Sequence, residues 1–385
     1  MMRNSSSTGL VNMKQKTLNL PEELIIQILL RLPVKSIVRF KCVCKSWLSL
    51  ISDPHFAESN FKLAANTPTY KLLFIAKSAP ETRSIDLDHD AMSLNSSAST
   101  TVKLNFLQLP PSSYSSLGIV GSCRGFLLLN CNANIFLWNP STGVHNQIPC
   151  SPIASNVHAY LYGFGYDPSQ DDYLVVLASY ERNTADLLKH LEFFSLRANV
   201  WKEIEDTHYM NAGFYWNGCD PRVGSLLNNA IHWVAFHHDT VVNHIIAFDL
   251  IERRVSEIPL PDDFEHESID YELWEFRGLL SLWVHHEEDD TVNIWVMERY
   301  KVQSSWVITL VVSFSEIPTQ YFSPICSRKN GDIVGTDGDK GLVKYNDKGQ
   351  LLEHHSYDEY PYVSLAMYTE SLLSLPVVGD RELAS

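Results

Sequence analysis

Short hydrophobic segments of similar character recur along this chain at intervals of about 50 residues, and this periodicity constrains the fold more than any other feature. The series is anchored at Trp138, Ser195, Phe248, Trp295 and Tyr345. Successive anchors are 57, 53, 47 and 50 residues apart. Because one four-stranded propeller blade spans a similar length of chain, the spacing predicts a β-propeller. The anchors match by character and not by identity, so a rolled β-sandwich or a pair of barrels remains the alternative.

Short β-rich segments separated by turn residues fill the chain beyond residue 66. We expect strands at Lys71–Ala76, Gly125–Cys131, Ile135–Trp138, Tyr173–Ser179, Leu191–Leu196, Ala230–Phe236, Ile245–Leu250, Leu279–Val284, Val292–Met297 and Leu342–Tyr345. The length of this region gives room for about six blades. Hairpin turns are expected at Lys329–Asp332 and Asn346–Gly349, and a long surface loop at Ala79–Thr101. The segment Tyr362–Leu375 is expected to pair with the first β segments, because ring closure removes exposed sheet edges.

Helical periodicity is confined to the region before residue 62. Asn19 is a candidate cap, Pro21 fits a first turn, and the pattern predicts a helix that ends at Leu32 before Pro33. Apolar residues between Lys35 and Ile51 then predict one broken helix or two short ones. Such a small unit buries too little surface to be stable alone, so we expect its apolar face to dock on the following domain or on a partner. A self-contained helical cap of the β domain is the alternative.

The helical region resembles the F-box over nearly its whole length. The segment LNLPEELIIQILLRLPVKSIVRFKCVCKSWLSLISDPHF has the Leu20-Pro21 start, the Leu32-Pro33 break, the Arg39–Trp47 core and the Asp53-Pro54-x-Phe56 end of that family. We therefore divide the chain into a leader (1–17) that we expect to be disordered, an F-box (18–62), a large β domain (66–376) and a tail (377–385).

An F-box implies a binding partner. By the resemblance, the module docks on the Skp-type adaptor of a cullin ligase and, through the adaptor, on the cullin and RING subunits. The resemblance places the adaptor contacts at Leu20, Pro21, Leu24, Ile28, Leu32, Pro33, Val43 and Trp47. Residues 1–62 carry nine Lys and Arg against four Asp and Glu, which gives +5. This charge suits an acidic adaptor surface and should raise the association rate more than the affinity.

The β region carries the motifs of a second family. They are GSCRGFLL at Gly121–Leu128, LWNPSTG at Leu137–Gly143, YGFGYDP at Tyr162–Pro168, NNAIHW at Asn228–Trp233 and SSW at Ser304–Trp306. In this order they resemble the plant F-box-associated domain, which is often called kelch-like, although the double glycine of a true kelch repeat is missing. The resemblance implies an α+β multidomain protein, in which a short all-α F-box precedes a large all-β propeller of about six blades.

Charge and composition disfavour several other classes of protein. The net charge is −15, and subtracting the +5 of residues 1–62 leaves −20 for the remainder. Because nucleic-acid affinity rests on basic surface, we expect no DNA or RNA partner. No run of 18 apolar residues and no secretory signal is found, so we expect no membrane association and a cytoplasmic or nuclear location. Seven cysteines without a CxxC pair predict buried free thiols.

Three patterns that could carry chemistry have simpler explanations. Gly163-x-Gly165 lacks the third glycine and the strand-to-helix context of a nucleotide fingerprint. Paired histidines at 237–238, 285–286 and 354–355 are expected in solvated loops at blade edges, whereas a metal site needs ligands on rigid elements. Thirteen Asp and Glu between Glu252 and Asp290 predict a solvated acidic rim or a pole for a basic target. We therefore predict no catalytic residue, cofactor or metal.

Together the two resemblances imply the substrate-recognition subunit of a Skp–cullin–F-box E3 ubiquitin ligase. Such a subunit makes no covalent bond and acts by holding a protein target near a ubiquitin-charged enzyme. No residue is assigned to target binding, because the loops of a propeller face are the most variable part. The alternatives are a propeller that binds a peptide or glycan independently of the ligase, and a propeller hydrolase with acids or histidines at its central channel.

Overall fold

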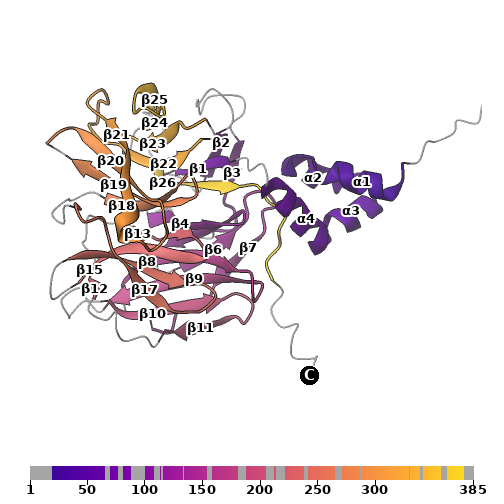
Figure 1. The fold of residues 1–385 in the computed structure, drawn as a ribbon. Coiled ribbons are helices and arrows are strands. Elements are labelled where there is room, and N and C mark those ends of the chain that lie inside the picture. Colours follow the sequence, from indigo (N-terminus) through magenta and orange to yellow (C-terminus); the bar gives the residue numbers. More distant parts are fainter. Residues whose placement is uncertain are drawn as a thin grey trace, which may run out of the picture.

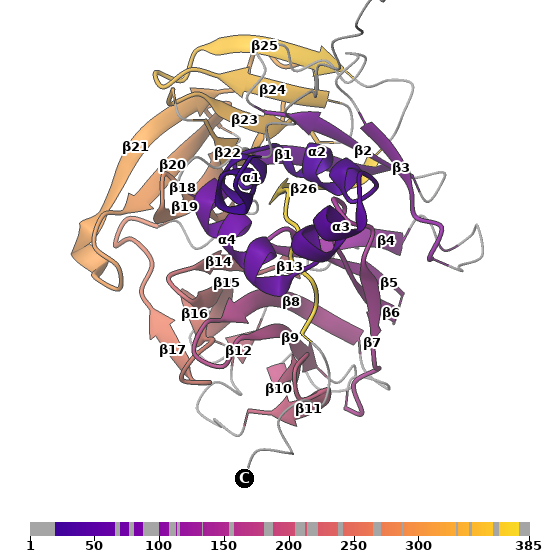
Figure 2. The ribbon, with the colours of Figure 1, turned by 90° about the vertical axis from the view of Figure 1, so that its right-hand side faces the viewer.

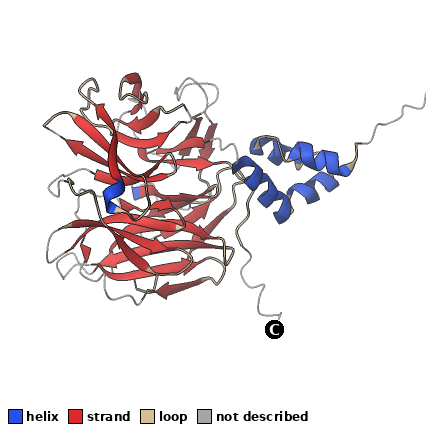
Figure 3. Ribbon diagram, in the orientation of Figure 1, coloured by secondary structure: helices blue, strands red, loops and turns tan. Residues whose placement is uncertain are grey.

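A computed structural model of the chain has a small helical module joined to a ring of six β-sheets (Figure 1). The structure describes residues 20–65, 70–76, 81–87, 100–107, 113, 116–132, 134–153, 158–180, 188–204, 212–213, 222–237, 242–264, 271–286, 288–328, 330–338, 341–356 and 362–376. The α-helices gather at one end of the molecule and the sheets at the other (Figure 3). The predicted class is thereby confirmed: a short helical module precedes a propeller with six blades.

Four short helices form the N-terminal module: α1 (Glu22–Leu29), α2 (Val34–Phe40), α3 (Lys45–Ile51) and α4 (Pro54–Ala65). Pro21 and Pro33 precede α1 and α2, where a missing backbone N–H breaks no helical hydrogen bond. Helix α1 ends three residues before the predicted Leu32, because the chain already turns there. The predicted cap Asn19 lies outside the described residues. No helix within the described ranges is long and apolar enough to cross a membrane.

The first three blades follow one another in sequence, except that the innermost strand of blade 1 is the last strand that the structure describes. Blade 1 contains β26 (Tyr362–Thr369), β1 (Tyr70–Ala76), β2 (Glu81–Asp86) and β3 (Thr100–Lys103). Blade 2 contains β4 (Leu117–Cys123), β5 (Phe126–Cys131), β6 (Asn134–Trp138) and β7 (His145–Ile148). Blade 3 contains β8 (His158–Asp167), β9 (Asp172–Tyr180), β10 (Leu188–Ser195) and β11 (Val200–Glu203), with β13 (Arg222–Val223) parallel to β8.

The other three blades complete the ring, which Figure 2 shows along its axis. Blade 4 contains β14 (Ser225–Leu227), β15 (Ala230–His237), β16 (Asn243–Asp249) and β17 (Val255–Ile258), with β12 (Ala212–Gly213) beside β15. Blade 5 contains β18 (Tyr271–Phe276), β19 (Leu279–His286), β20 (Thr291–Met297) and β21 (Trp306–Ser313), which follows the short turn η4 (Gln303–Ser305). Blade 6 contains β22 (Ser323–Ser327), β23 (Ile333–Thr336), β24 (Gly341–Tyr345) and β25 (Leu351–Ser356).

All five repeat anchors lie on the third of the four antiparallel strands that follow one another in their blades. The anchors and their strands are Trp138 on β6, Ser195 on β10, Phe248 on β16, Trp295 on β20 and Tyr345 on β24. The ten strands expected from sequence are all present. The turn predicted at Asn346–Gly349 connects β24 and β25, and the described residues 330–332 of the other predicted turn lie between β22 and β23, whereas Lys329 lies outside the described residues. The periodicity therefore marks one equivalent strand in each of blades 2 to 6.

Blade 1 has a third strand that the sequence did not indicate. The expected surface loop at Ala79–Thr101 is wrong for Glu81–Asp86, which forms β2 between β1 and β3, and for Thr100 and Thr101, which begin β3. Residues 79, 80 and 88–99 lie outside the described part of the chain. The segment ETRSID has only one large apolar residue, Ile85, so its pattern is weak. Its backbone ladder to β1 and the burial of Thr82 and Ile85 hold it in the sheet.

The ring closes where the last strand pairs with the first. β26 runs antiparallel to β1, with Tyr70 opposite Thr369 and Phe74 opposite Leu365, as the closure hypothesis predicted. Without β26, β1 would present an unpaired edge toward the axis. Two distant parts of the sequence therefore form a single blade.

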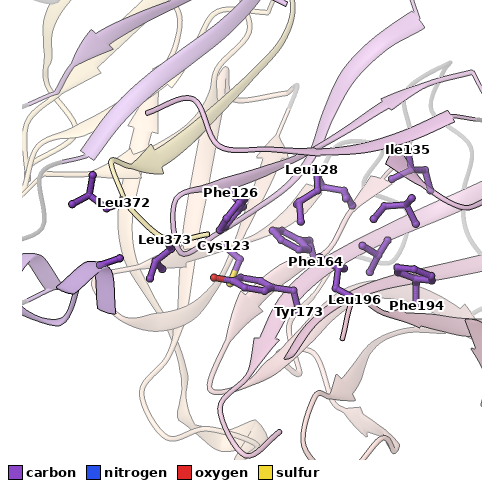
Figure 4. Close-up of a cluster of buried hydrophobic side chains, with 14 of the residues drawn as sticks. Cys123, Phe126, Leu128, Ile135, Phe164, Tyr173, Phe194, Leu196, Leu372 and Leu373 are labelled. Carbon is purple, nitrogen blue, oxygen red and sulfur yellow. The ribbon is translucent and has the colours of Figure 1, made fainter. Parts of the chain in front are cut away.

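The apolar core is divided into six layers, each between two neighbouring blades. Successive side chains of a strand point to opposite faces, so Leu72 and Phe74 of β1 pack against blade 6, whereas Leu73 and Ile75 pack against blade 2. The layer between blades 2 and 3 is the largest and extends into the helical module (Figure 4).

Close packing between blades also explains Gly163 and Gly165 of β8. A Cβ atom on Gly163 would lie 2.8 Å from the side chains of Ile231 and Trp233, and one on Gly165 would lie 2.4 Å from Leu250. Both glycines therefore let blade 3 approach blade 4. Their spacing is a packing feature of the propeller.

The cysteine prediction holds for only part of the described set. Cys123, Cys131 and Cys326 are buried free thiols, whereas Cys42, Cys44 and Cys150 are exposed. Cys44 is exposed because it begins α3, where its sulfur accepts a hydrogen bond from the Trp47 N–H at 3.5 Å.

Proline substitution tests the role of ring closure. Ala366→Pro removes a backbone N–H that faces Leu73 of β1 in the closing pair, so the free energy of unfolding should fall by about 1–3 kcal/mol. Leu352→Pro is the matched control, because Leu352 is 47% exposed on the outermost strand β25 and falls at a register shift. Urea denaturation followed by tryptophan fluorescence would measure both. Equal losses would contradict a special role for the closing pair.

Candidate functional site

The inward faces of the four helices form a small apolar core. Leu29, Val34, Ile37 and Ile51 are buried there, and the rings of Phe40 and Trp47 meet edge to face at 5.5 Å. The end of α1 is tied to α4, because the Asn60 side-chain amide donates to the Leu30 carbonyl at 3.0 Å. Asp53 begins α4 by accepting the His55 N–H at 2.7 Å. These contacts fix the helices relative to one another.

Several large apolar side chains of the same module point into solvent. Val43 is 59% exposed, Leu20 56%, and Leu24 and Ile28 51% each. They are the four most exposed large apolar side chains among the described residues. Leu20, Leu24 and Ile28 recur every four residues, which puts them on one face of the α1 region. Leu48 on α3 is 47% exposed, and we call these five residues the exposed apolar set.

The residues expected to bind an adaptor divide into two groups. Six are exposed: Leu20, Pro21, Leu24, Ile28, Pro33 and Val43. Leu32 and Trp47 are half-buried and pack against the apolar core. Sequence reasoning missed Leu48, although a seven-residue helix that contains Trp47, Leu48, Leu50 and Ile51 cannot bury all of them.

Basic side chains surround these helices. Lys35 and Arg39 of α2 and Lys45 of α3 are exposed, as is Arg31 after α1. The Arg31 guanidinium donates to the backbone and side-chain oxygens of Gln27 at 2.6 and 2.7 Å. The module therefore combines exposed apolar side chains with a positively charged surface.

Helix α4 connects the module to the propeller. Its Phe56 and Ala57 belong to the apolar layer that also contains Phe126 of blade 2 and Tyr173 of blade 3. Its Glu58 accepts a hydrogen bond from Arg124 at 2.6 Å. The sequence predicted that the apolar face of the helical unit would dock on the following domain or on a partner. In the structure, the unit docks on the following domain, the propeller.

Arg124 lies in the turn between β4 and β5 and contacts both domains. Its Nε donates to the Tyr173 hydroxyl at 3.3 Å, and its guanidinium carbon lies 3.9 Å from the Tyr166 ring centre and 4.7 Å from that of Phe61. Burial lowers the pKa of Arg124, but Tyr173 and the Glu58 carboxylate outweigh this effect, so the net pKa is raised. Its charge is therefore secure at any physiological pH.

The histidine pairs lie in strands, so the expectation of solvated loops is wrong for those that the structure describes. His285 is near the end of β19 and stacks on Phe314 at 4.5 Å. His354 of β25 bonds to the buried Asp337 carboxylate at 2.7 Å. His237 ends β15, and His238 lies outside the described residues. The pairs occupy strand ends, where ring stacking and hydrogen bonds give them structural partners.

Comparison with known proteins agrees with both parts of the fold. Residues 74–374 match the family model of the F-box associated beta propeller domain, and residues 17–59 match that of the F-box domain. An F-box/kelch-repeat protein of Arabidopsis thaliana is 29% identical over 85% of this chain and 88% of its own length. The F-box protein CPR1 of the same plant is 28% identical over 81% of this chain and 78% of its own length.

The fold and the exposed apolar set define a protein with two binding parts, a helical docking module and a propeller. The chain belongs to the F-box-associated β-propeller family, and its helical module is an F-box. In general terms, this architecture supports a substrate-receptor role, in which the F-box binds a Skp-type adaptor and the propeller binds a protein target.

The exposed apolar set should be dispensable for folding. Ile28→Ala changes a side chain that is half exposed, so the free energy of unfolding should change by about 0.5 kcal/mol or less. The same change at Ile37, which is fully buried, should cost about 2–5 kcal/mol. Urea denaturation of the two variants would compare them directly. A large loss at Ile28 would assign that residue to the core of the fold.

Proposed function

We propose that this chain is the substrate-recognition subunit of a Skp–cullin–F-box E3 ubiquitin ligase. The F-box binds the Skp-type adaptor, and the adaptor links it to the cullin and RING subunits. The propeller holds a protein target, and ubiquitin reaches the target from a charged enzyme at high effective concentration. The chain itself makes and breaks no covalent bond. Its place of action is the cytoplasm, the nucleus or both.

One observation carries the proposal: the four most exposed large apolar side chains among the described residues all belong to the F-box. All four, Leu20, Leu24, Ile28 and Val43, are among the residues that the family resemblance assigns to the adaptor. Large apolar side chains that serve no core are typical of protein-binding surfaces. Burying such anchors in a partner supplies most of the binding energy at an interface.

The remaining residues assigned to the adaptor lie at the starts of helices or partly within the core of the F-box. Pro21 and Pro33 are exposed at the starts of α1 and α2 and fix the direction in which each helix begins. Leu32 and Trp47 contribute the part of each side chain that the core leaves exposed. We add Leu48 to the adaptor contacts because its exposed fraction, 47%, resembles that of Leu24 and Ile28.

The adaptor contacts can be tested by a double substitution. Leu24→Ser with Ile28→Ser should weaken binding of a purified Skp-type adaptor by about 100-fold or more, because each side chain is expected to be an anchor of the interface. The matched control is Val200→Ser with Ile251→Ser, two propeller residues that are each 42% exposed. Calorimetric titration would measure both affinities. Unchanged affinity in the F-box variant would overturn the proposal.

The positive charge of the F-box predicts a kinetic effect. Replacing Lys35, Arg39 and Lys45 by glutamine should slow adaptor association and leave dissociation nearly unchanged, because exposed charges mainly steer the encounter. Raising the salt concentration should likewise lower the rate at which the wild-type chain associates with the adaptor. Stopped-flow binding across a salt series would give both rates. An association rate that is independent of salt would contradict electrostatic steering.

A further inference from the structure

The contact between the F-box and the propeller has three layers, and the C-terminal segment Ser371–Leu375 is the middle one. This segment follows β26 and leaves the ring on the face that carries the helices (Figures 1 and 2). Leu372 and Leu373 are buried in the same apolar cluster as Phe56 of α4 and Phe126 of blade 2. Figure 4 shows both leucines at the end of the cluster that is nearest a helix.

Hydrogen bonds from a turn of blade 2 hold this segment in place. The side-chain nitrogen of Asn139, which is fully buried, lies 3.2 Å from the carbonyl oxygens of Ser371 and Leu373. The Ser371 N–H donates in turn to the Ser141 hydroxyl at 3.2 Å. Asn139 and Ser141 belong to the turn between β6 and β7, so one blade turn specifies the path of the C-terminal segment.

The adjacent turn of the same blade positions Arg124. Arg124 and Gly125 both have positive φ angles, 51° and 83°, which is the geometry of a tight hairpin turn. A Cβ atom on Gly125 would lie 2.5 Å from the Ser371 hydroxyl, so only glycine allows the C-terminal segment to lie this close. In this turn, Gly125 leaves room for Ser371, and Arg124 contacts Glu58 and Phe61 of α4.

We infer that Arg124 and the segment Ser371–Leu375 form a joint that fixes the direction in which the F-box leaves the propeller. Arg124 is a positioning residue, because it contacts α4 and is not one of the exposed residues assigned to the adaptor. Two domains joined only by a chain segment would reorient freely. Here the ion pair of Arg124 with Glu58, the packing of Arg124 on the Phe61 ring, and the buried Leu372 and Leu373 hold the two domains together. On the proposed function, which this consequence requires, the joint fixes where a bound target stands relative to the charged enzyme.

Distances between two spin labels would test the joint in the full chain without any partner. The labels are placed at Ser49→Cys on α3 and Ser304→Cys in blade 5, both exposed, after Cys42, Cys44, Cys150 and Cys219 are changed to serine. We expect one narrow distance distribution in the otherwise unchanged chain. Arg124→Asn should broaden it, because asparagine tolerates a positive φ but removes the guanidinium. A broad distribution before any change at Arg124 would overturn the inference.

Arg277→Asn is the matched control. Arg277 and Gly278 form the corresponding turn of blade 5, with φ angles of 53° and 79°, but Arg277 bonds within the propeller to the Gly331 carbonyl. Its replacement should leave the distribution narrow. Equal broadening by both arginine variants would show a general loosening of the turns and would also overturn the inference.

Two further variants change the other two parts of the joint, helix α4 and the C-terminal segment. Glu58→Gln removes the partner charge on α4, and a chain that ends at Glu370 keeps β26 but lacks the middle layer. Both should broaden the distribution, and the shortened chain should do so most. Arg124→Lys keeps the charge, so its distance distribution should be narrower than that of Arg124→Asn and broader than that of the unchanged chain. Thermal unfolding of each variant would confirm that the ring is intact. A narrow distribution in all three weakened variants, Arg124→Asn included, would refute the joint.

A reconstituted ligase separates this inference from the proposed function. Adaptor affinity should be the same for the wild-type chain and Arg124→Asn. Mass spectrometry of ubiquitin on the receptor's own lysines should show modification at a restricted set in the wild type and at a wider set in Arg124→Asn. Failure of the adaptor to bind either chain would sink the proposed function and leave the spin-label result standing. An identical lysine pattern in both chains would sink the positioning role.

Discussion

The antiparallel pairing of β26 with β1 is the interaction on which the rest of the structure depends. Every blade buries both of its faces against its neighbours, and three of the six core layers contain residues of β26 or of the segment that follows it. Because closure uses β26, the last strand that the structure describes, the two layers beside blade 1 cannot form from neighbouring repeats alone. The first and last parts of the sequence must meet, and they do so with Tyr70 opposite Thr369.

Closure also determines where the F-box lies. The chain enters β1 from the face at which it leaves β26, because the two strands are antiparallel neighbours. Helix α4 and the segment that follows Thr369 are therefore brought to the same side of the ring. The hairpin turn at Arg124 opens on this side as well. A joint of α4, the C-terminal segment and blade 2 is thus a geometric consequence of closing the ring with the final strand.

The sequence predicted those features whose signal is local. The blade spacing, the ten strands and the short helices follow from apolar periodicity. The prediction failed at Glu81–Asp86, because a strand can be held by its neighbours' backbone when only Ile85 supplies large apolar surface. It failed for the histidine pairs because proximity to acidic residues resembles a loop pattern, although His354 in fact meets the buried Asp337. It could not indicate the role of Arg124, since Glu58 and Tyr173 lie 66 and 49 residues away.

The F-box resolves a conflict between stability and binding by using different faces for each. A module of four short helices cannot bury enough surface alone, so it must share a core with something larger. Its α4 face does this through Phe56 and Ala57. Binding a partner requires the opposite, apolar side chains that stay exposed, and Leu24 and Ile28 are such side chains. Were the module held only by its adaptor, the propeller would be free to swing. Because its core is continuous with blades 2 and 3, the partner meets side chains whose direction the propeller already fixes.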